Sequence, residues 1–305
     1  GLSALDIGQI LIMPDRDNIA IKLKTAVERD RSSTSAELPK VRILDMPVTD
    51  SAKDTLEAVQ MMLKAKVGAI VVLGGDGTHR LVAHACGKIP MACISTGTNN
   101  AFPGNPEATI AGLAAGAVGR SLVTPDVVCH SNKRLCVRVN GQDTIPALVD
   151  VCITTDTQTG TRALWRSDRL RKLFLTFAEP GQVGLSSIGS LISPTSREDN
   201  NGLVIDIDPT AKEFKKLMAP IAPGLFEPVA ITNYEPISIN QKCVLDNSVG
   251  TLAYDGEREV TVFSGDRIEI ALDRRGPRTI DMTKTIENIA YSGLLINDDT
   301  LQSDR

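Results

Sequence analysis

A glycine-rich turn is the part of this sequence whose residue types have the clearest chemical use. Residues 74–78 read Gly-Gly-Asp-Gly-Thr and lie between an apolar run and a segment of helical character. Glycines let a backbone adopt positive φ angles and turn its N–H groups toward one anion, and the next helix start adds the positive end of its dipole. The turn therefore predicts a phosphate-binding site. The contacts would come from Gly74, Gly75, Gly77 and Thr78.

The carboxylate inside this turn needs an explanation of its own. No Lys-Ser or Lys-Thr pair follows the glycines, so the turn is not the common P-loop, and the Gly-x-Gly-x-x-Gly dinucleotide pattern is also missing. Asp76 would repel a bare phosphate, but it could bind Mg²⁺ or accept the proton of an attacking hydroxyl. Asp76 is thus a candidate catalytic residue and the candidate Mg²⁺ ligand. The alternative is a tight turn in which Asp76 caps the helix.

A second polar loop follows the next apolar segment. Residues 97–102 read Gly-Thr-Asn-Asn-Ala-Phe and come after a strand expected at residues 89–94. The candidate nucleotide-binding residues here are Gly97, Thr98, Asn99 and Asn100. The alternative is a polar turn with no ligand. His79 and Arg80, after the first turn, could reach a phosphate or lie on a solvated helix surface.

Alternating strand and helix patterns position these loops. Strands are expected at 9–13, 41–44 and 69–73, and helices near 18–28, from Asp50 or Ser51, and at 80–86. The continuous apolar run at 69–73 is typical of a strand covered on both faces. Repeated βα units of this kind predict a doubly wound parallel sheet, in which ligands gather at the carboxyl ends of the strands.

The second half of the chain has a different pattern of expected secondary structure. Short strand candidates separated by Gly, Pro and Asn occur at 135–139, 147–154, 203–207, 259–263 and 267–272. We therefore expect an α/β nucleotide-binding domain at 1–120, a mainly β domain at 121–278, and a tail at 279–305 that packs back on the first domain.

The composition excludes several classes of partner. The formal charge is −4 and aromatic residues make up 3% of the chain, so basic stripes with stacking platforms for nucleic acid are missing. No apolar run approaches the roughly 20 residues that cross a membrane, and the start carries no leader pattern. The six cysteines form no Cys-x-x-Cys pair, which indicates reduced thiols in a cytoplasm.

The Gly-rich turn also carries a family resemblance. Gly-Gly-Asp-Gly-Thr after a hydrophobic strand resembles the signature of the NAD kinase and diacylglycerol kinase superfamily. Residues 97–102 are similar to the Gly-Thr-Gly-Asn-Asp-Phe stretch of its lipid kinases, but Ala101 stands where those kinases have Asp. A lipid acceptor therefore ranks third among the acceptors that the resemblance implies.

A stretch in the second half resembles the part of NAD kinases that holds the dinucleotide. Residues 147–151 are similar to Ala-Leu-Asn-Glu-Val, with Val149 in place of Asn and Asp150 in place of Glu. Asp150 could bind a ribose hydroxyl or a metal. The alternative is a β-strand with one outward Asp.

A later stretch resembles the region from which lipid kinases take their catalytic base. Residues 254–257 read Tyr-Asp-Gly-Glu, which implies catalytic roles for Asp255 and Glu257. Taken alone, Asp-Gly between alternating strands predicts a β-hairpin.

Motifs over nearly the whole chain together resemble the acetoin catabolism protein X family, a group similar to NAD kinases. This resemblance implies a phosphotransferase with ATP or another phosphate donor, Mg²⁺, and a soluble hydroxyl acceptor: NAD by default, or an acetoin-pathway metabolite. It also implies a homo-oligomer formed through the β domain, and a chain that opens at the superfamily's second strand. The alternative from another class is a non-catalytic nucleotide-binding regulatory protein.

Overall fold

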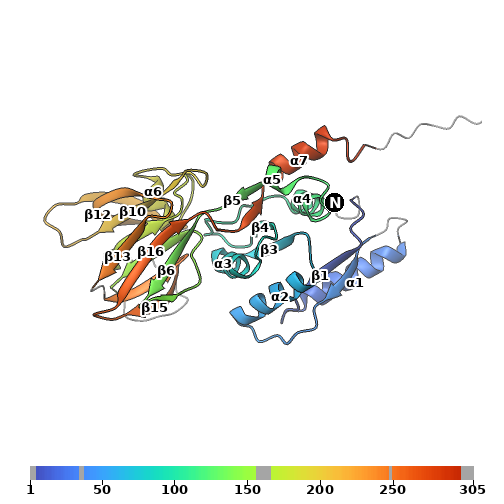
Figure 1. Ribbon diagram of the computed structural model, residues 1–305, viewed down its shortest axis with the longest axis horizontal. Helices are drawn as coiled ribbons and strands as arrows, with labels where there is room; N and C mark the ends of the chain where they lie inside the picture. The colour runs from blue at the N-terminus through green and yellow to red at the C-terminus, as the bar shows by residue number, and fades with distance from the viewer. Residues whose placement is uncertain (1–4, 34–37, 156–165, 247–248, 297–305) are drawn as a thin grey trace, which may run out of the picture.

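The computed structural model describes residues 5–33, 38–155, 166–246 and 249–296. Figure 1 shows two lobes, one of helices and short parallel strands and one of long antiparallel strands. The predicted class, α/β with a parallel-sheet N-terminal region and a mainly β C-terminal region, is confirmed.

The first lobe is built from βα units. Strand β1 pairs with β2 and strand β3 with β4, each in parallel, and helices connect the strands. The predicted cap of α2 is confirmed at Ser51, whose side chain accepts the Lys53 N–H. The elements are β1 (Gln9–Ile12), α1 (Ile19–Ser33), β2 (Lys40–Ile43), α2 (Ala52–Lys64), β3 (Ile70–Gly74), α3 (Asp76–Ala85), β4 (Met91–Ser95), α4 (Ala108–Gly119), α5 (Pro125–Val128) and β5 (Cys129–Ser131).

One face of β3 is open, so the expectation of a strand covered on both faces is wrong. Ile70 and Val72 are buried in a cluster with side chains of α2 and α3. Val71 and Leu73, on the opposite face, are 47% and 64% exposed. Helix α4 packs in a cluster with Ala92 of β4 and with β17 instead of covering β3. An apolar run is thus buried on two faces only where two layers exist to cover it.

The second lobe holds two antiparallel sheets, of strand order β11-β12-β10-β9-β8-β14-β15 and β13-β16-β6-β7. The five strands predicted here are confirmed as β6, β8, β10, β15 and β16. The elements are β6 (Arg134–Val139), β7 (Gln142–Asp143), β8 (Asp150–Thr154), the short 3₁₀ helix η2 (Ser167–Arg169), β9 (Leu170–Leu175), α6 (Ser186–Ser190), β10 (Asn201–Ile207), β11 (Lys215–Ala222), β12 (Leu225–Ser238), β13 (Lys242–Asp246), β14 (Gly250–Tyr254), β15 (Glu257–Val262) and β16 (Arg267–Asp273).

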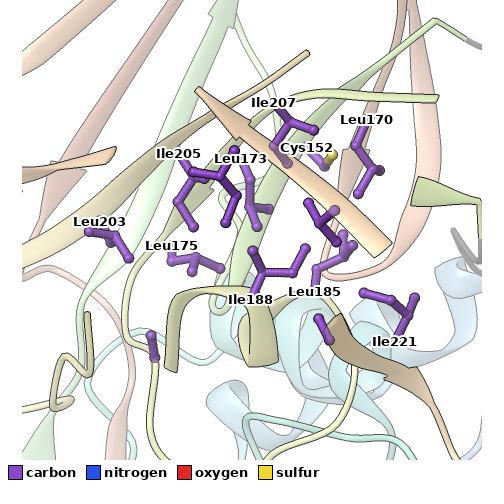
Figure 2. Close-up of a cluster of buried hydrophobic side chains, with 14 of the residues drawn as sticks. Cys152, Leu170, Leu173, Leu175, Leu185, Ile188, Leu203, Ile205, Ile207 and Ile221 are labelled. Carbon is purple, nitrogen blue, oxygen red and sulfur yellow. The ribbon is translucent and has the colours of Figure 1, made fainter. Parts of the chain in front are cut away.

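Two apolar cores hold this lobe together. Between the sheets, Leu135 and Ile270 of the smaller sheet pack in one cluster with Phe174 and Leu252 of the larger. On the other face of the larger sheet, Ile188 of α6 belongs to a second cluster, which Figure 2 shows with its neighbours on β8, β9 and β10. Helix α6 is therefore anchored by its apolar side chain, which fixes the loop before it.

The chain finally returns to the first lobe. Strand β17 (Arg278–Ile280) pairs in parallel with β4 and antiparallel with β5. Helix α7 (Met282–Tyr291), capped by the Asp281 carboxylate, lies beside α4 in Figure 1, and Ile289 packs in the α4 core. The first lobe thus contains both the beginning and the end of the described chain.

Candidate active site

The glycines of the turn before α3 are needed for space and not for unusual angles. None of Gly74, Gly75 and Gly77 has a positive φ, so that expectation is wrong. A Cβ on Gly74 would lie 2.7 Å from the Thr78 Cβ, and a Cβ on Gly75 would lie 2.9 Å from Asn100 Oδ1. The missing side chains therefore let the turn pack against its own helix and against the loop after β4.

The loop after β4 contributes unequally to the site. Asn100 donates from Nδ2 to Ser95 Oγ at 2.7 Å, which fixes the amide against the turn. Asn99 and Asn100 line the cleft described below, whereas Gly97 and Thr98 are exposed and lie outside its lining. The structure thus brings two of the four predicted residues of this loop to the candidate site.

Asp76 is the first residue of α3, and its side chain crosses to the second loop. Its Oδ2 accepts the Ala101 N–H at 2.9 Å and its Oδ1 accepts the Phe102 N–H at 2.8 Å. The N-cap of α3 is Gly75, without a side-chain cap, so the capping alternative for Asp76 is not observed. Burial, together with the charge of Asp255, raises the pKa of Asp76 to about 6, although the two N–H donors and Arg197 oppose the rise.

Asp255, in the second lobe, is a second buried carboxylate that lines the same two cavities as Asp76. Its buried side chain accepts the N–H groups of Leu148, Val149 and Asp150 at 2.8 to 3.1 Å. Arg80 Nε of α3 lies 3.8 Å from Asp255 Oδ2. Burial raises the pKa of Asp255, and the guanidinium and the N–H donors oppose that rise. The carboxylate therefore ties the start of β8 to α3 of the first lobe.

The Asp-Gly step itself forms the hairpin that its sequence predicts. Asp255 and Gly256 have φ angles of 48° and 82° and connect β14 to β15, where Tyr254 pairs with Glu257. The positive angles explain why Asp-Gly occurs here. The side chain of Glu257 lies outside the described part of the structure.

Asp150 begins β8 and points inward, so the alternative of an outward Asp is wrong. The residue is 5% exposed, and its Oδ1 has no hydrogen-bond partner among the described residues. Burial raises the pKa of Asp150 well above the ordinary value, and the charges of Asp255 and Asp76 raise it further. Burial thus favours the neutral form of the Asp150 carboxyl group, which has one oxygen available to a ligand.

Two cavities meet at Asp76. The first is an open cleft of about 810 Å³, lined by the turn before α3, the loop after β4, and the loops that follow β1 and β2. The second is an inner cavity of about 50 Å³ that reaches the loop before α6. Asp76, Asn99 and Asp255 line both. A molecule in the cleft and a molecule in the inner cavity would therefore meet at the Asp76 carboxylate.

His79 and Arg80 do not form a solvated helix surface. Both are buried, and burial lowers the pKa of His79, whose Nδ1 lies 2.8 Å from Gly75 O. The guanidinium carbon of Arg80 lies 5.6 Å from the centre of the Tyr254 ring. Arg80 thus packs between the lobes, although it also contributes to the lining of the cleft.

Arg197 is a site residue that the sequence reasoning missed. Its Nη1 donates to Phe102 O at 2.8 Å and its Nη2 to Ala101 O at 2.5 Å. Its guanidinium carbon lies 4.0 Å from the centre of the Phe177 ring. Arg197, a cation of the second lobe, therefore binds the carbonyl oxygens of the same two residues, Ala101 and Phe102, whose N–H groups donate to Asp76. No local signal marks Arg197, because its partners lie about a hundred positions away.

The loop after β1 is also part of the cleft, and the sequence did not predict it as a site element. Residues 13–17 line the cleft, where Asp15 accepts the Ile19 and Ala20 N–H groups and caps α1. Arg16 is largely exposed and pairs with Asp50 at 2.6 Å. An apolar strand followed by Pro and Asp is the signal that could have found this loop, because strand ends of one parallel layer share an edge.

Mg²⁺ fits this site only in the company of a nucleotide. No group of three or more His, Cys, Asp or Glu side chains able to hold a metal occurs among the described residues. In kinase sites Mg²⁺ is bound by one or two carboxylates together with substrate phosphates and water. Asp76 offers one such carboxylate at the cleft, which fits that arrangement.

Comparisons with known proteins place the chain in a family. Residues 10–119, from within β1, match the ATP-NAD kinase N-terminal domain, and residues 133–275 match the acetoin catabolism protein X C-terminal domain. Acetoin catabolism protein X of Cupriavidus necator is 39% identical over 298 residues, which cover 96% of this chain and 83% of the relative. The chain belongs to the acetoin catabolism protein X family. The resemblance predicted from the motifs is confirmed.

The chain also aligns with solved structures of NAD and NADH kinases. Yeast NADH kinase complexed with NADH aligns with a TM-score of 0.53 at 15% identity, covering 99% of this chain and 84% of that chain. An NAD kinase from Archaeoglobus fulgidus in complex with ATP gives a TM-score of 0.45 at 14% identity, with coverages of 94% and 98%. The yeast enzyme and the family model show an NAD kinase-like fold, that of a kinase-like nucleotide-binding protein. Within the described residues, no helix has both the length and the apolar character to cross a membrane.

Proposed function

We propose that this protein is an ATP-dependent phosphotransferase that transfers a phosphoryl group to a soluble hydroxyl acceptor, with NAD as the default acceptor. The observation that carries the proposal is the position of Asp76 where the open cleft meets the inner cavity. A nucleotide in the cleft would place its phosphates against Gly75, Gly77 and Thr78, at the positive end of α3.

Asp76 would act as the general base. Its two oxygens are oriented by the Ala101 and Phe102 N–H groups, and each oxygen keeps a second lone pair for a proton. The acceptor oxygen gives its proton to Asp76 and forms a bond to the γ-phosphorus, while the bond from that phosphorus to ADP breaks. A pKa of about 6 leaves Asp76 mostly ionised at neutral pH, close to the best value for a base.

Charge neutralisation would complete the catalysis. Mg²⁺ bound to the nucleotide phosphates would supply the positive charge that phosphoryl transfer needs. Arg16, which is largely exposed, and Arg80 are the cations among the residues that line the cleft, where those phosphates would bind. Asp255 and Asp150 line the acceptor side and would orient the acceptor.

A second candidate function is a non-catalytic, nucleotide-binding regulatory protein. The observation that favours it is that both Asp76 oxygens already accept backbone N–H groups, as a purely structural carboxylate would. The buried Val149, where NAD kinases have Asn, also offers no polar group to a dinucleotide. A lipid acceptor ranks third, and a link to acetoin degradation rests on the name of the relative.

The test is ADP release from ATP and Mg²⁺ over a panel of hydroxyl acceptors, with NADP formation from NAD measured separately. Asp76→Asn should lower kcat by at least about 10³-fold, because the amide takes up no proton and its NH2 group cannot accept one of the two backbone N–H groups that the carboxylate accepts. If wild type binds ATP but releases no ADP with any acceptor, the regulatory candidate replaces the kinase.

Self-association through the β lobe belongs to the same proposal. Strands β11 and β12 lie at one end of the larger sheet and expose large apolar side chains there. These are Phe214 before β11, Met218, Phe226 and Tyr234. A patch of this kind on a sheet edge favours pairing with a second copy, and the molar mass in solution by light scattering tests it.

A further inference from the structure

The inner cavity beside Asp76 is small and unusual in its chemistry. Its volume of about 50 Å³ is some three to five times the 10–15 Å³ that one water needs on the same measure. It therefore has room for a few non-hydrogen atoms and not for a base or a second nucleotide. The lining consists of Asp76, Asn99, Asp150, Val183, Gly184, Leu185, Ser186, Ile221, Asp255 and Gly256.

Two polar atoms in this lining have no hydrogen-bond partner in the part of the chain that the structure describes. They are Asp150 Oδ1 and Ser186 Oγ, and both residues are at least 95% buried. Buried polar groups of folded proteins are nearly always paired, because an unpaired group costs roughly 1–3 kcal/mol. Two such atoms facing one cavity, from β8 and from α6, indicate a ligand that supplies their missing partners.

The charges of the lining restrict that ligand further. Three carboxyl groups face the cavity, and no Lys or Arg is among its lining residues. An anionic group placed there would meet nearby acidic oxygens without a compensating cation in the wall, at a cost that grows with burial. Val183, Leu185 and Ile221 add an apolar wall that would contact carbon.

We propose that the inner cavity holds the reacting end of a small uncharged acceptor with two neighbouring oxygens, a vicinal diol or an α-hydroxyketone of about two to four carbons. This rests on the proposed phosphotransferase function and replaces NAD, the default acceptor there, with a smaller one. The reacting hydroxyl lies at Asp76, which takes its proton as the oxygen bonds to the γ-phosphorus and ADP leaves. The second oxygen pairs with Ser186 and Asp150, and the carbon chain lies against the apolar wall.

The experiment compares uncharged acceptors with anionic ones, and 3-hydroxybutanone and lactate are the pair matched in size. ADP release is measured with glycerol against glycerol 3-phosphate, with 3-hydroxybutanone against lactate, and with NAD. The uncharged member of each pair should have the higher kcat/KM, by about a hundredfold or more. Equal rates within the pairs, or turnover of NAD alone, would overturn the proposal and leave the phosphotransferase function standing.

A pair of serine variants on α6 supplies the matched control. Ser186→Ala should raise KM for 3-hydroxybutanone by about three- to tenfold, because one hydrogen bond is lost. Ser190→Ala removes a hydroxyl that bonds within its own helix turn and lies outside the cavity lining, so KM should stay within about twofold. If both variants behave like wild type, Ser186 does not contact the acceptor and the proposal is wrong.

Ligand-observed NMR with 3-hydroxybutanone measures binding in the cavity independently of phosphoryl transfer. Binding that Ser186→Ala weakens and Ser190→Ala does not, in a protein that releases no ADP, would support the cavity assignment and reject the phosphotransferase function. Absence of both ADP release and binding would overturn both.

Discussion

The same Asp-Gly dipeptide occurs at the end of a strand in each lobe, and the two surroundings differ in almost every respect. Asp76 follows β3, accepts one N–H on each oxygen and borders both cavities. Asp255 follows β14 and also lines both cavities, but its buried side chain faces three N–H donors and the Arg80 guanidinium. A dipeptide therefore does not decide whether a carboxylate does chemistry. The number of fixed donors around it and the presence of a paired cation decide.

The comparison assigns different roles to the two carboxylates. A buried carboxylate with several donors and a cation is held in one geometry and is costly to disturb. A carboxylate at a cavity junction with free lone pairs can exchange a proton. We expect Asp255 to join the lobes and Asp76 to carry the reaction, which keeps Asp76 as the first catalytic candidate and gives Asp255, the second-rank candidate of the sequence, a structural role.

The largest effect that tests this comparison is on stability. Asp255→Ala should lower the free energy of unfolding by about 3–5 kcal/mol, because Arg80 and three backbone N–H groups lose their shared acceptor. Urea unfolding measures it. Asp246→Ala is the control, since Asp246 pairs with Arg267 where both side chains are 62% exposed, and it should cost less than about 1 kcal/mol. Equal small losses would show that Asp255 does not hold the lobes together.

A smaller effect is expected where the second lobe reaches Asp76. Arg197→Gln should lower kcat by about 10- to 100-fold with little change in KM for ATP, because the two residues whose N–H groups orient Asp76 lose their bidentate clamp. Arg197→Lys should recover part of the loss, since one amine can still donate to a carbonyl.

The matched control for Arg197 is Arg274→Gln. Arg274 also clamps carbonyls, those of Glu198 and Asp199, but contacts neither Ala101 nor Phe102. Hydrogen exchange at the Ala101 and Phe102 amides gives a readout that needs no activity: exchange should quicken in Arg197→Gln and stay unchanged in Arg274→Gln. Unchanged exchange in both would remove Arg197 from the site.

A feature could be predicted from the sequence when the residues that form it lie close together in the chain. The Asp-Gly hairpin and the Ser51 cap depend on residues within a few positions, and both are confirmed. The order of βα units and five strands of the β lobe followed from local hydrophobic patterns. Strands β9, β11 and β12 were not predicted, and the open face of β3 could not be, because burial depends on which distant layers meet.

The same distinction between near and distant residues separates the site residues that were predicted from those that were not. Asp76 was identified from its loop, but its partners Ala101 and Phe102 lie 25 and 26 positions away. The inward direction of Asp150 and the role of Arg197 depend on how the second lobe docks on the first. The sequence patterns therefore identified the loop residues that we propose to contact phosphates, and missed distant residues such as Arg197 that position them.

The smallest of the expected effects is a pH dependence that should belong to Asp76. With a pKa of about 6, the base is about one-tenth ionised at pH 5 and about nine-tenths at pH 7, so kcat/KM should rise roughly tenfold over that interval and then level. Stability should move the other way. Folding raises this pKa from 3.8, so the stabilising contribution of Asp76 is full below about pH 4 and is lost as the pH rises through about 6. Rate profiles and urea unfolding at each pH, in wild type and Asp76→Asn, measure both trends. Flat profiles between pH 5 and 7 would mean that Asp76, like Asp255, is a structural carboxylate, and the contrast between the two lobes would disappear.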